Sequence, residues 1–367
     1  MIWKCVLLLV VAVVMQHCYK LALIMGYHKT VYAHWPGKCH SVHPVLQGSE
    51  DIALSEDNLA FISSGLRIQV CDLDGIDPRN NEFVGRIYLF DFNNPEAGAS
   101  EMILPKGMMG PTFNPHGIDT WFDSATGRVY LFVVNHRADE ETVELFTFDR
   151  KNSNNSLAHV RTYREPEFRS LNDVLAVSSE EFYVTNDGYF RNCWKTLEFL
   201  FLLKWSSIVH VTQEGGGEIV ATGHALNSLG KSSGLVFATS PVGRFLNVYK
   251  RNDDGTLLLR HSIDVGTGID NIFVHPHTMD LWFGAHPIGH AFLEHTTNLD
   301  TPAPSQVIRL HPTGEQDDPF SSVELFELFS DSGKLISASS SVAVSGNRLL
   351  IGSLLQKLVY CEMTVPN

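Results

Sequence analysis

Acidic and amide side chains stand next to each other at four places in this chain of 367 residues: Glu50-Asp51, Asn172-Asp173, Asn186-Asp187 and Asp270-Asn271. The second and fourth pairs each open an apolar run that we expect to be a buried strand. Burying a carboxylate is costly unless a cation balances it, and few Lys or Arg residues stand nearby in the sequence. One such pair alone would indicate a turn or an Asx cap. Their recurrence at strand starts favours a bound metal, and oxygen ligands without cysteine favour calcium.

Two histidines lie in similarly tight contexts, His116 in Phe-Asn-Pro-His-Gly-Ile and His136 in Val-Val-Asn-His. A lone histidine in such a setting is more often a hydrogen-bonded core residue than a catalytic group. Because each adjoins sequence typical of strands, both side chains could project into one tunnel, where one imidazole would orient the other and raise its basicity. The sequence leaves their proximity open.

The charge balance excludes one class of partner. The formal net charge is −14, so a phosphate backbone would be repelled and nucleic acid is not expected as a partner. One catalytic pattern can also be set aside. Gly230-Lys-Ser-Ser-Gly234 matches G-x-S-x-G, but it leads into the strand-like run that starts at Leu235, whereas a nucleophile elbow leads into a helix.

The elements that must position these groups are short β-rich runs punctuated by Gly, Asn, Asp or Pro. They cover 59–63, 86–92, 128–134, 181–185, 235–239, 245–249, 281–283 and 349–351. Comparable segments return about every fifty residues, near the repeat length of propeller blades. A blade buries its faces only against its neighbours, so the ring must close. Since no linker rich in Gly, Ser or Pro interrupts the chain, residues 31–367 are predicted to form one all-β domain.

Two apolar segments depart from this pattern. Residues 1–30 begin with Lys4 ahead of an apolar run from Val6 to Met15, which is typical of a secretory signal. No clean cleavage site follows, so the segment is either removed or retained as an anchor. Cys193 to Lys204 contains no Gly or Pro and is apolar around most of its circumference, which predicts one helix on the rim. That helix either covers the propeller mouth or dips into lipid.

The cysteines of the folded body and a glycosylation sequon are both consistent with a protein exported through the secretory pathway. Four cysteines lie in the folded body, Cys39, Cys71, Cys193 and Cys361, with no zinc-type spacing. A bridge between Cys39 and Cys361 would close nearly the whole domain and contribute about 4 to 5 kcal/mol in the loop-entropy model, but sequence alone does not establish the pairing. Asn154-Asn-Ser156 is a sequon in a polar loop, so Asn154 is the predicted glycosylation site.

Taken together, the motifs resemble those of the serum paraoxonase/arylesterase family. The strings occur in family order over nearly the whole chain, and this collinearity is more specific than any one of them. They are Gly48-Ser-Glu-Asp51, Ala60-Phe-Ile-Ser-Ser-Gly65, Phe113-Asn-Pro-His-Gly-Ile118, Val133-Val-Asn-His136, Thr142-Val-Glu-Leu-Phe146, Leu171-Asn-Asp173, Thr185-Asn-Asp187, Asp270-Asn271 and Leu358-Val-Tyr-Cys-Glu362.

The resemblance implies a six-bladed β-propeller with two calcium ions in its central tunnel. By position, it implies that the catalytic ion is held by Glu50, Asn172, Asn227, Asp270 and Asn271. It implies that Asp51, Asp173 and the carbonyl of Ile118 hold the structural ion. His116 and His136 match the proposed catalytic dyad, in which the first activates water and the second carries its proton away. Cys39 and Cys361 match the family disulfide, and the N-terminal segment matches the family's anchor to lipoprotein or membrane.

Three departures from the family pattern bear on the site. The segment after Asn227 is several residues shorter than in the family, which makes Asn227 the least secure of the expected ligands. Gly188 stands where the family usually has a histidine, and this thins the polar network behind the site. Ala285 replaces a cysteine common in vertebrate members, which the chemistry should tolerate because that thiol is not a ligand.

The expected activity is calcium-dependent hydrolysis of lactones and aryl esters, with organophosphate triesters as promiscuous substrates. Calcium would polarise the carbonyl, and either the His dyad or a metal-bound carboxylate such as Glu50 or Asp270 would activate water. One alternative is a weak or inactive propeller that binds lipid or a partner through the N-terminal segment and residues 193–204. Another is a related calcium propeller with a different hydrolytic specificity. We expect the protein to be secreted, or held at a membrane by an uncleaved signal segment.

Overall fold

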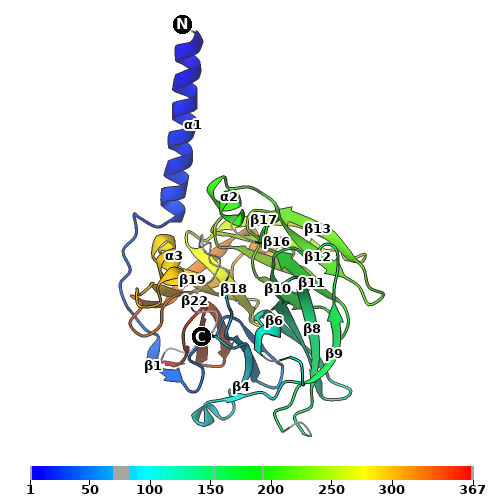
Figure 1. The fold of residues 1–367 in the computed structure, drawn as a ribbon. Coiled ribbons are helices and arrows are strands. Elements are labelled where there is room, and N and C mark those ends of the chain that lie inside the picture. Colours follow the sequence, from blue (N-terminus) through cyan, green and yellow to red (C-terminus); the bar gives the residue numbers. More distant parts are fainter. Residues whose placement is uncertain (1, 69–82, 109, 152–153, 192–193, 365–367) are drawn as a thin grey trace.

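Six four-stranded antiparallel sheets are arranged as the blades of a propeller in the computed structural model (Figure 1). The structure describes residues 2–68, 83–108, 110–151, 154–191 and 194–364. The prediction of a six-bladed all-β propeller is therefore confirmed. Cys71 and Cys193, noted in the sequence, lie outside the described residues.

Each of the first five blades runs from an inner strand to an outer strand in chain order. The first three blades are β2 (Ile52–Leu54), β3 (Leu59–Ser64), β4 (Arg86–Asp91) and β5 (Ala99–Glu101); β6 (Pro115–Asp123), β7 (Arg128–His136), β8 (Glu141–Phe148) and β9 (Ala158–Tyr163); and β10 (Leu171–Ala176), β11 (Phe182–Asn186), β12 (Ser206–Val211) and β13 (Gly217–Gly223). The next two are β14 (Leu229–Ser232), β15 (Leu235–Ser240), β16 (Phe245–Arg251) and β17 (Leu257–Asp264); and β18 (Gly268–Val274), β19 (Leu281–His286), β20 (Ser305–Pro312) and β21 (Val323–Asp331).

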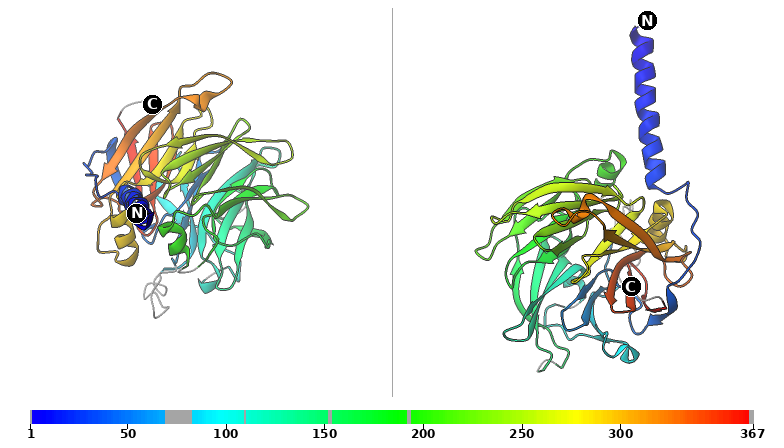
Figure 2. Two further views of the ribbon diagram at one scale, coloured as in Figure 1. Left: turned by 90° about the horizontal axis from the view of Figure 1, so that it is seen from above. Right: turned by 180° about the vertical axis from the view of Figure 1, so that it is seen from behind.

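The last blade closes the ring by joining the two ends of the chain. Its strands are β22 (Ser339–Ser345), β23 (Arg348–Ser353), β24 (Leu358–Met363) and, as the outer strand, β1 (Gly37–Val42). Cys39 lies directly opposite Cys361 in this pairing, and the two form a disulfide across 322 residues. Seen from above, the blades follow one another around the ring (Figure 2). Neighbouring inner strands contact each other all the way round, from β2 through β22 and back to β2.

The blades are held together by apolar side chains packed between adjacent sheets. One such cluster joins the first two blades through residues such as Phe61 and Phe146, and another joins the second and third through Phe132 and Phe182. These residues are fully buried, and all but Phe146 come from the β-rich runs recognised in the sequence. Each sheet therefore depends on both neighbours, which is why the fold is one ring.

Helices gather at one end of the ring (Figure 1). α1 (Ile2–Ile24) projects from the body and is the one described helix long and apolar enough to cross a membrane. α2 (Lys195–Leu200) is shorter than the helix expected over 193–204, because Leu202 adopts a φ of +51° and turns the chain towards β12. α3 (Gly289–Thr297) was not predicted. In the part of the chain that the structure describes, three short 3-10 turns complete the elements, at Pro95–Ala97, Gly110–Thr112 and Pro319–Ser321.

Candidate metal centre and active site

The expected metal ligands all come from the start of an inner strand. In four blades the pairing between the inner strand and its neighbour is interrupted by a β-bulge, and the bulged positions are His116-Gly117, Asn172-Asp173, Asp270-Asn271 and Ser340-Ser341. Glu50-Asp51 and Asn227-Ser228 stand at the equivalent places, just before β2 and β14. A bulge turns two successive side chains off the regular ladder. Three of the four doublets in the sequence, Glu50-Asp51, Asn172-Asp173 and Asp270-Asn271, thus occupy one repeated position around the tunnel, whereas Asn186 ends the second strand of its blade, β11.

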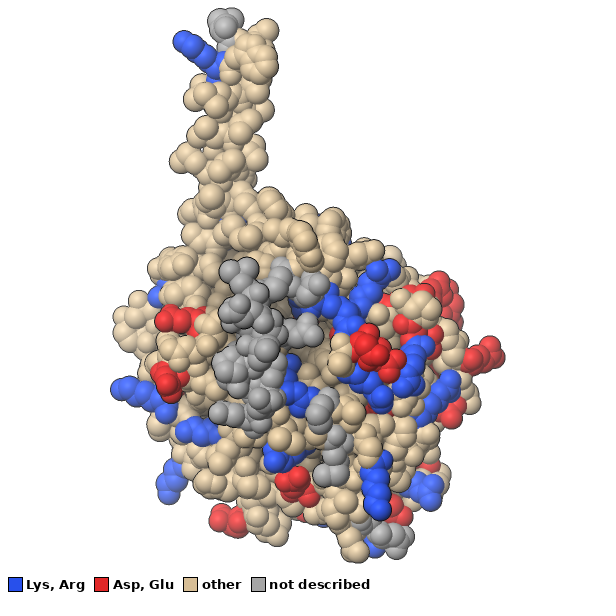
Figure 3. Space-filling model, in the orientation of Figure 1, with Lys and Arg blue, Asp and Glu red and all other residues tan. Residues whose placement is uncertain are grey.

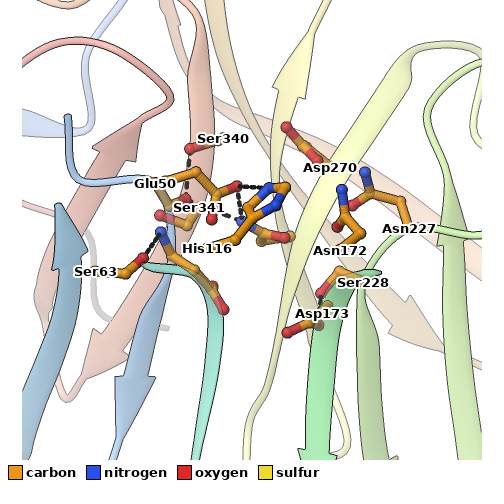
Figure 4. A network of polar contacts seen from close by, with 12 residues as sticks. Glu50, Ser63, His116, Asn172, Asp173, Asn227, Ser228, Asp270, Ser340 and Ser341 are labelled. Atoms are coloured by element: carbon orange, nitrogen blue, oxygen red, sulfur yellow. Dashed lines mark hydrogen bonds and ion pairs between the residues drawn. The ribbon is translucent and has the colours of Figure 1, made fainter. Parts of the chain in front are cut away.

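The residues expected at the catalytic ion form what we call the pocket set: Glu50, Asn172, Asn227, Asp270 and Asn271. All of these except Asn271 line one pocket of about 390 Å³, which His116 also borders. Figure 4 shows Glu50, His116, Asn172, Asn227 and Asp270 projecting towards a common space from different blades. Asn271 lies behind Glu50, and its amide donates hydrogen bonds to Oε1 and to the carbonyl of that residue, both at 2.9 Å.

Three oxygens of the pocket set are buried without a hydrogen-bond donor among the described residues. They are Oε2 of Glu50, Oδ1 of Asn227 and Oδ1 of Asn271. A buried acceptor left unsatisfied destabilises a protein by roughly 1 to 3 kcal/mol, so three in one place call for an explanation. A hard cation that takes oxygen ligands would satisfy all three at once. The donor set therefore fits calcium.

The residues expected at the structural ion behave differently. Asp51 and Asp173, which we call the inner pair, lie beneath the pocket and are buried. Asp51 accepts the N–H groups of Ile52 and Ile118, both at 2.8 Å. Asp173 accepts the N–H groups of Val174 and Leu229 at 2.7 Å and the hydroxyl of Ser228 at 2.6 Å. Ile118 thus lies beside the pair, as the family pattern implies.

These carboxylates are electrostatically unfavourable without a cation. Burial, reinforced by the neighbouring Asp173 and Glu50 carboxylates, raises the pKa of Asp51 well above its usual range. Burial raises the pKa of Asp173 to about 7. Burial also raises the pKa of Asp270, although His286, whose Nε2 lies 2.8 Å from Oδ2, acts in the opposite direction. A bound cation would reverse these shifts because it favours the charged form.

The candidate centre depends on amides as well as acids. Within the described ranges, no three His, Cys, Asp or Glu side chains gather closely enough to hold a metal by themselves. Two of the three unsatisfied oxygens belong to asparagines. A site of mixed carboxylate and amide oxygens suits calcium, whereas zinc or copper would require histidine or cysteine.

The segment after Asn227 forms a tight hairpin and leaves Asn227 at the pocket. β14 and β15 are joined by the two-residue turn Ser233-Gly234, in which both residues have positive φ, as a tight hairpin requires. This turn lies at the end of the hairpin that is far from Asn227. At the near end, the N–H of Asn227 donates to the carbonyl of Thr239 at 2.9 Å, and the Asn227 side chain faces the pocket.

The structure brings the two histidines together. Nδ1 of His116 lies 2.8 Å from Nε2 of His136, and Nε2 of His116 lies 3.5 Å from Oε1 of Glu50. Burial by itself would lower the pKa of His116, but the carboxylates of Glu50, Asp187 and Asp270 outweigh it and raise that pKa. On its far side, Nδ1 of His136 lies 2.6 Å from Oε2 of Glu141.

A lysine contacts Asp187, the residue before Gly188. Nζ of Lys195 lies 2.5 Å from Oδ2 of Asp187, and the pair lines the pocket. Burial would raise the pKa of Asp187, but Lys195 and Ser170 outweigh it and lower that pKa. A side chain at Gly188 would meet the Glu198 carboxylate, 3.2 Å from the position of a Cβ. Lys195 and Glu198 thus provide polar groups around Gly188.

Sequence reasoning missed Glu141, Lys195 and His286 as parts of the site. Glu141 lies in an acidic run, and its spacing from His136 carries no signal until the two strands pair. Lys195 was assigned only to a rim helix. His286 follows Ala285 in the sequence, and its contact with Asp270 depends on the bulge in β18. The expected glycosylation site, Asn154, lies in an exposed turn; its modification stays a prediction.

The walls of the pocket are apolar above this polar floor. They are formed by Leu66, Ile68, Phe199, Leu203, Val242, Phe292 and Leu293. Phe199 belongs to α2 and Leu293 to α3, so both rim helices border the entrance. Such a site suits a small, largely apolar molecule with one polar reacting group.

Comparisons of the sequence and of the fold with known proteins agree with this geometry. The chain is 32% identical over 328 residues to serum paraoxonase/arylesterase 2 of Gallus gallus, covering 89% of this chain and 88% of that protein. It is 33% identical over 336 residues to serum paraoxonase/arylesterase 1 of Homo sapiens, with 89% and 88% covered. For serum paraoxonase/lactonase 3 of Mus musculus the identity is 32% over 334 residues, with 89% of each chain covered.

Solved structures confirm the fold alone. The PQQ-bound aldose sugar dehydrogenase of Streptomyces coelicolor matches with a TM-score of 0.51 and 12% identity, over 90% of this chain and 99% of that one. A glucose dehydrogenase matches with a TM-score of 0.52 and 14% identity, over 88% and 98%. The sequence profile described as Arylesterase matches residues 31–363. With that match and the relatives above, the chain belongs to the arylesterase family of enzymes, which includes the serum paraoxonases.

Proposed function

We propose that this protein is a calcium-dependent hydrolase that opens lactones and cleaves aryl esters. The observation that carries the proposal is the pocket floor, where the unsatisfied buried oxygens of Glu50 and Asn227, with that of Asn271 behind them, accompany a pair of hydrogen-bonded imidazoles. The curated relatives are named arylesterases, paraoxonases and lactonases, which supports the same class of reaction.

Two calcium ions are proposed, one for each group of ligands. The pocket set would hold the first, and the inner pair with the carbonyl of Ile118 would hold the second. An ion on the pocket set would polarise the substrate carbonyl and stabilise the negative charge that develops on its oxygen. The inner pair has no pocket surface, so its role would be to stabilise the convergence of β2, β6 and β10.

His116 is the proposed base. Its Nε2 faces the pocket, where it can take a proton from a water molecule that attacks the carbonyl, and His136 can carry that proton away through Nδ1 of His116. The rival bases are already engaged: Asp270 contacts His286, and Glu50 accepts a hydrogen bond from Asn271. Ser232 of the G-x-S-x-G string lies in β14, next to the hairpin turn, and a covalent serine intermediate is not required.

The shape of the pocket indicates the substrate class. The apolar walls suit the aliphatic or aromatic part of a lactone or ester, and the polar floor suits its carbonyl. An organophosphate triester presents a phosphoryl oxygen in place of the carbonyl and is proposed as a slower, promiscuous substrate.

The helical end of the ring is proposed as the surface that attaches to a membrane or lipoprotein. Figure 3 shows α1 without charged side chains along most of its length. His17 of α1 contacts the carbonyl of Leu200 at 2.6 Å, and Leu200 and Phe201 are exposed beside it. Replacing both Leu200 and Phe201 by serine should reduce flotation with phosphatidylcholine vesicles and leave the hydrolysis of a water-soluble lactone unchanged. Equal flotation of the two proteins would exclude α2 from the surface.

The decisive experiment is hydrolysis of an aliphatic lactone and of phenyl acetate with and without a calcium chelator, together with a metal count per chain. We expect turnover that the chelator removes, readdition of calcium restores, and two calcium ions per chain. Full activity in the chelator would overturn the calcium mechanism. A well-folded, calcium-loaded protein that binds vesicles without turnover would show a binding propeller instead.

A further inference from the structure

The hydrogen-bonded pair of histidines continues into a third residue that lies outside the motifs described above. Oε2 of Glu141 lies 2.6 Å from Nδ1 of His136, and the Glu141 side chain is only 5% exposed. His136 ends β7, Glu141 begins β8, and the two are directly opposite each other in the ladder. The contact is therefore fixed by strand register, which places the two Cβ atoms within about 5.5 Å.

The other oxygen of Glu141 is held as well. Oε1 lies 3.0 Å from Nε of Arg191, whose guanidinium also donates to the carbonyls of Asp139 and Arg137 at 3.1 and 3.3 Å. Those two carbonyls belong to the loop between β7 and β8. The arginine thus prevents the carboxylate from rotating away from His136, because both carboxylate oxygens are engaged at once.

We infer that Glu141 is a positioning residue that fixes which nitrogen of each imidazole carries the proton. This inference rests on the proposed function, in which His116 takes a proton from water. A carboxylate only accepts hydrogen bonds, so Nδ1 of His136 must be the donor to Glu141. Nε2 of neutral His136 is then an acceptor and receives the proton of Nδ1 of His116. Nε2 of neutral His116 is left with its lone pair towards the pocket; Oε1 of Glu50 lies 3.5 Å from it, and the proposed calcium on Glu50 would balance that negative charge.

Without the carboxylate, this order of donors and acceptors is lost. In Glu141→Gln, the amide can donate to Nδ1 of His136 and favour the opposite tautomer. His136 would then donate through Nε2 to Nδ1 of His116, and the proton of neutral His116 would move to Nε2, which could no longer act as a base. The same logic explains why replacing the aspartate of a serine protease triad by asparagine costs about 10⁴-fold in kcat.

The test compares Glu141→Gln with Glu141→Asp and with Glu140→Gln as the matched control. Glu140 neighbours Glu141 but pairs instead with Arg164 at 2.9 Å and Arg137 at 3.8 Å. At saturating calcium we expect Glu141→Gln to lower kcat on a lactone about 10²-fold with KM within about twofold. Glu141→Asp keeps the carboxylate and should recover at least a tenth of the kcat, and Glu140→Gln should match the wild type.

A second measurement needs no substrate. The proton between His136 and Glu141 should give a far-downfield one-dimensional ¹H NMR signal. It should be absent in Glu141→Gln and in His136→Gln but retained in Glu140→Gln. Circular dichroism and a calcium count would exclude misfolding; if Glu141→Gln does not fold, Glu141→Asp and Arg191→Met take its place, and both should weaken that signal.

The outcomes separate the two hypotheses. Wild-type turnover with an unchanged kcat in Glu141→Gln, or a downfield signal that survives in it, would overturn the role of Glu141 and leave the proposed function standing. A wild-type protein without turnover on any lactone or ester would overturn the proposed function, while the NMR comparison would still decide whether Glu141 sets the tautomer.

Discussion

The pocket set and the inner pair are built from the same repeated pair of residues, yet their oxygens have opposite environments. Every carboxylate oxygen of Asp51 and Asp173 accepts a hydrogen bond from the protein. Among the described residues, Glu50, Asn227 and Asn271 each keep one buried oxygen without a donor. The inner pair is thus held in place by hydrogen bonds from the backbone. The unsatisfied oxygens of the pocket set gain a partner only when a ligand binds.

This difference in hydrogen bonding suggests separate roles for the two groups, one in stability and one in catalysis. Because the backbone fixes the inner pair, repulsion between its two carboxylates acts against the fold itself unless a cation relieves it. The pocket set borders the solvent-accessible cavity, so its unsatisfied oxygens can exchange ligands without disturbing the strands (Figure 4). Substitutions in the pocket set should therefore lower activity, and substitutions in the inner pair should lower stability.

The largest effect is expected from Asp270→Asn in the pocket set. The change removes one negative charge from the proposed calcium ligands and alters the contact with His286. We expect kcat on a lactone to fall by about 10²- to 10³-fold, the range seen when one group that stabilises developing charge is lost. The melting temperature in calcium should change by only a few degrees.

Asp264→Asn is the matched control for that variant, since Asp264 ends β17 and is 56% exposed. It should retain wild-type kcat. If Asp270→Asn instead unfolds the protein and leaves the specific activity of the folded fraction intact, the division of roles between the two groups is wrong.

The inner pair should show the reverse pattern in Asp173→Asn. In calcium, loss of this carboxylate should lower the free energy of unfolding by ~3 to 5 kcal/mol, because a buried charge loses its partner. In chelator, the same substitution should be nearly neutral, because it removes a buried carboxylate that has no cation. Urea unfolding of the wild type and of Asp173→Asn, each in calcium and in chelator, measures the four free energies of unfolding. A variant equally destabilised in chelator would show that Asp173 acts through its hydrogen bonds alone.

The pH dependence of the calcium-free protein tests the same charges without mutation. Burial raises the pKa of Asp173 from 3.8 to about 7, so between these values the folded chain binds more protons than the unfolded chain. Stability from this group is fully present below the unfolded pKa and is lost as the pH rises through the folded pKa. In chelator the free energy of unfolding should therefore fall by roughly 2 to 3 kcal/mol from pH 5 to pH 7.

Calcium should remove or reverse that slope, because the bound ion favours the ionised carboxylates. Urea unfolding at the two pH values, with and without calcium, measures it. A calcium-free protein that becomes more stable as the pH rises would contradict the picture of mutual repulsion in the inner pair.

Much of the fold could be predicted from the sequence because it is encoded locally. All eight predicted β-rich runs coincide with strands, since apolar β-formers bounded by turn residues are a short-range signal. α3 was missed because Gly289–Thr297 is short and carries no clear apolar periodicity. The end of α2 was misplaced because Leu202 turns the chain despite a favourable helical composition.

The candidate site was only partly predictable, because its geometry depends on register. The adjacent acid and amide residues were visible, but the bulges that align them appear only when the strands pair. His116 and His136 are 20 residues apart, and nothing local shows that their rings meet. Glu141 lies in an acidic run with Asp139 and Glu140, and only the ladder distinguishes it from its neighbours.

Asn227→Ala should have the smallest effect, and it tests whether Asn227 belongs to the pocket set. The variant keeps the contacts that its backbone makes with Thr239 and Thr185, so the start of β14 should be undisturbed. It removes one of the three unsatisfied oxygens. We expect about a tenfold loss of calcium affinity at the site that controls turnover, or ~1.4 kcal/mol, with the thermal stability due to the inner ion unchanged. A calcium titration of lactone turnover measures the calcium affinity, and a melting curve measures the thermal stability. If the calcium dependence of turnover is unchanged, Asn227 does not belong to the pocket set. Its side chain would then not bind the ion in this hairpin.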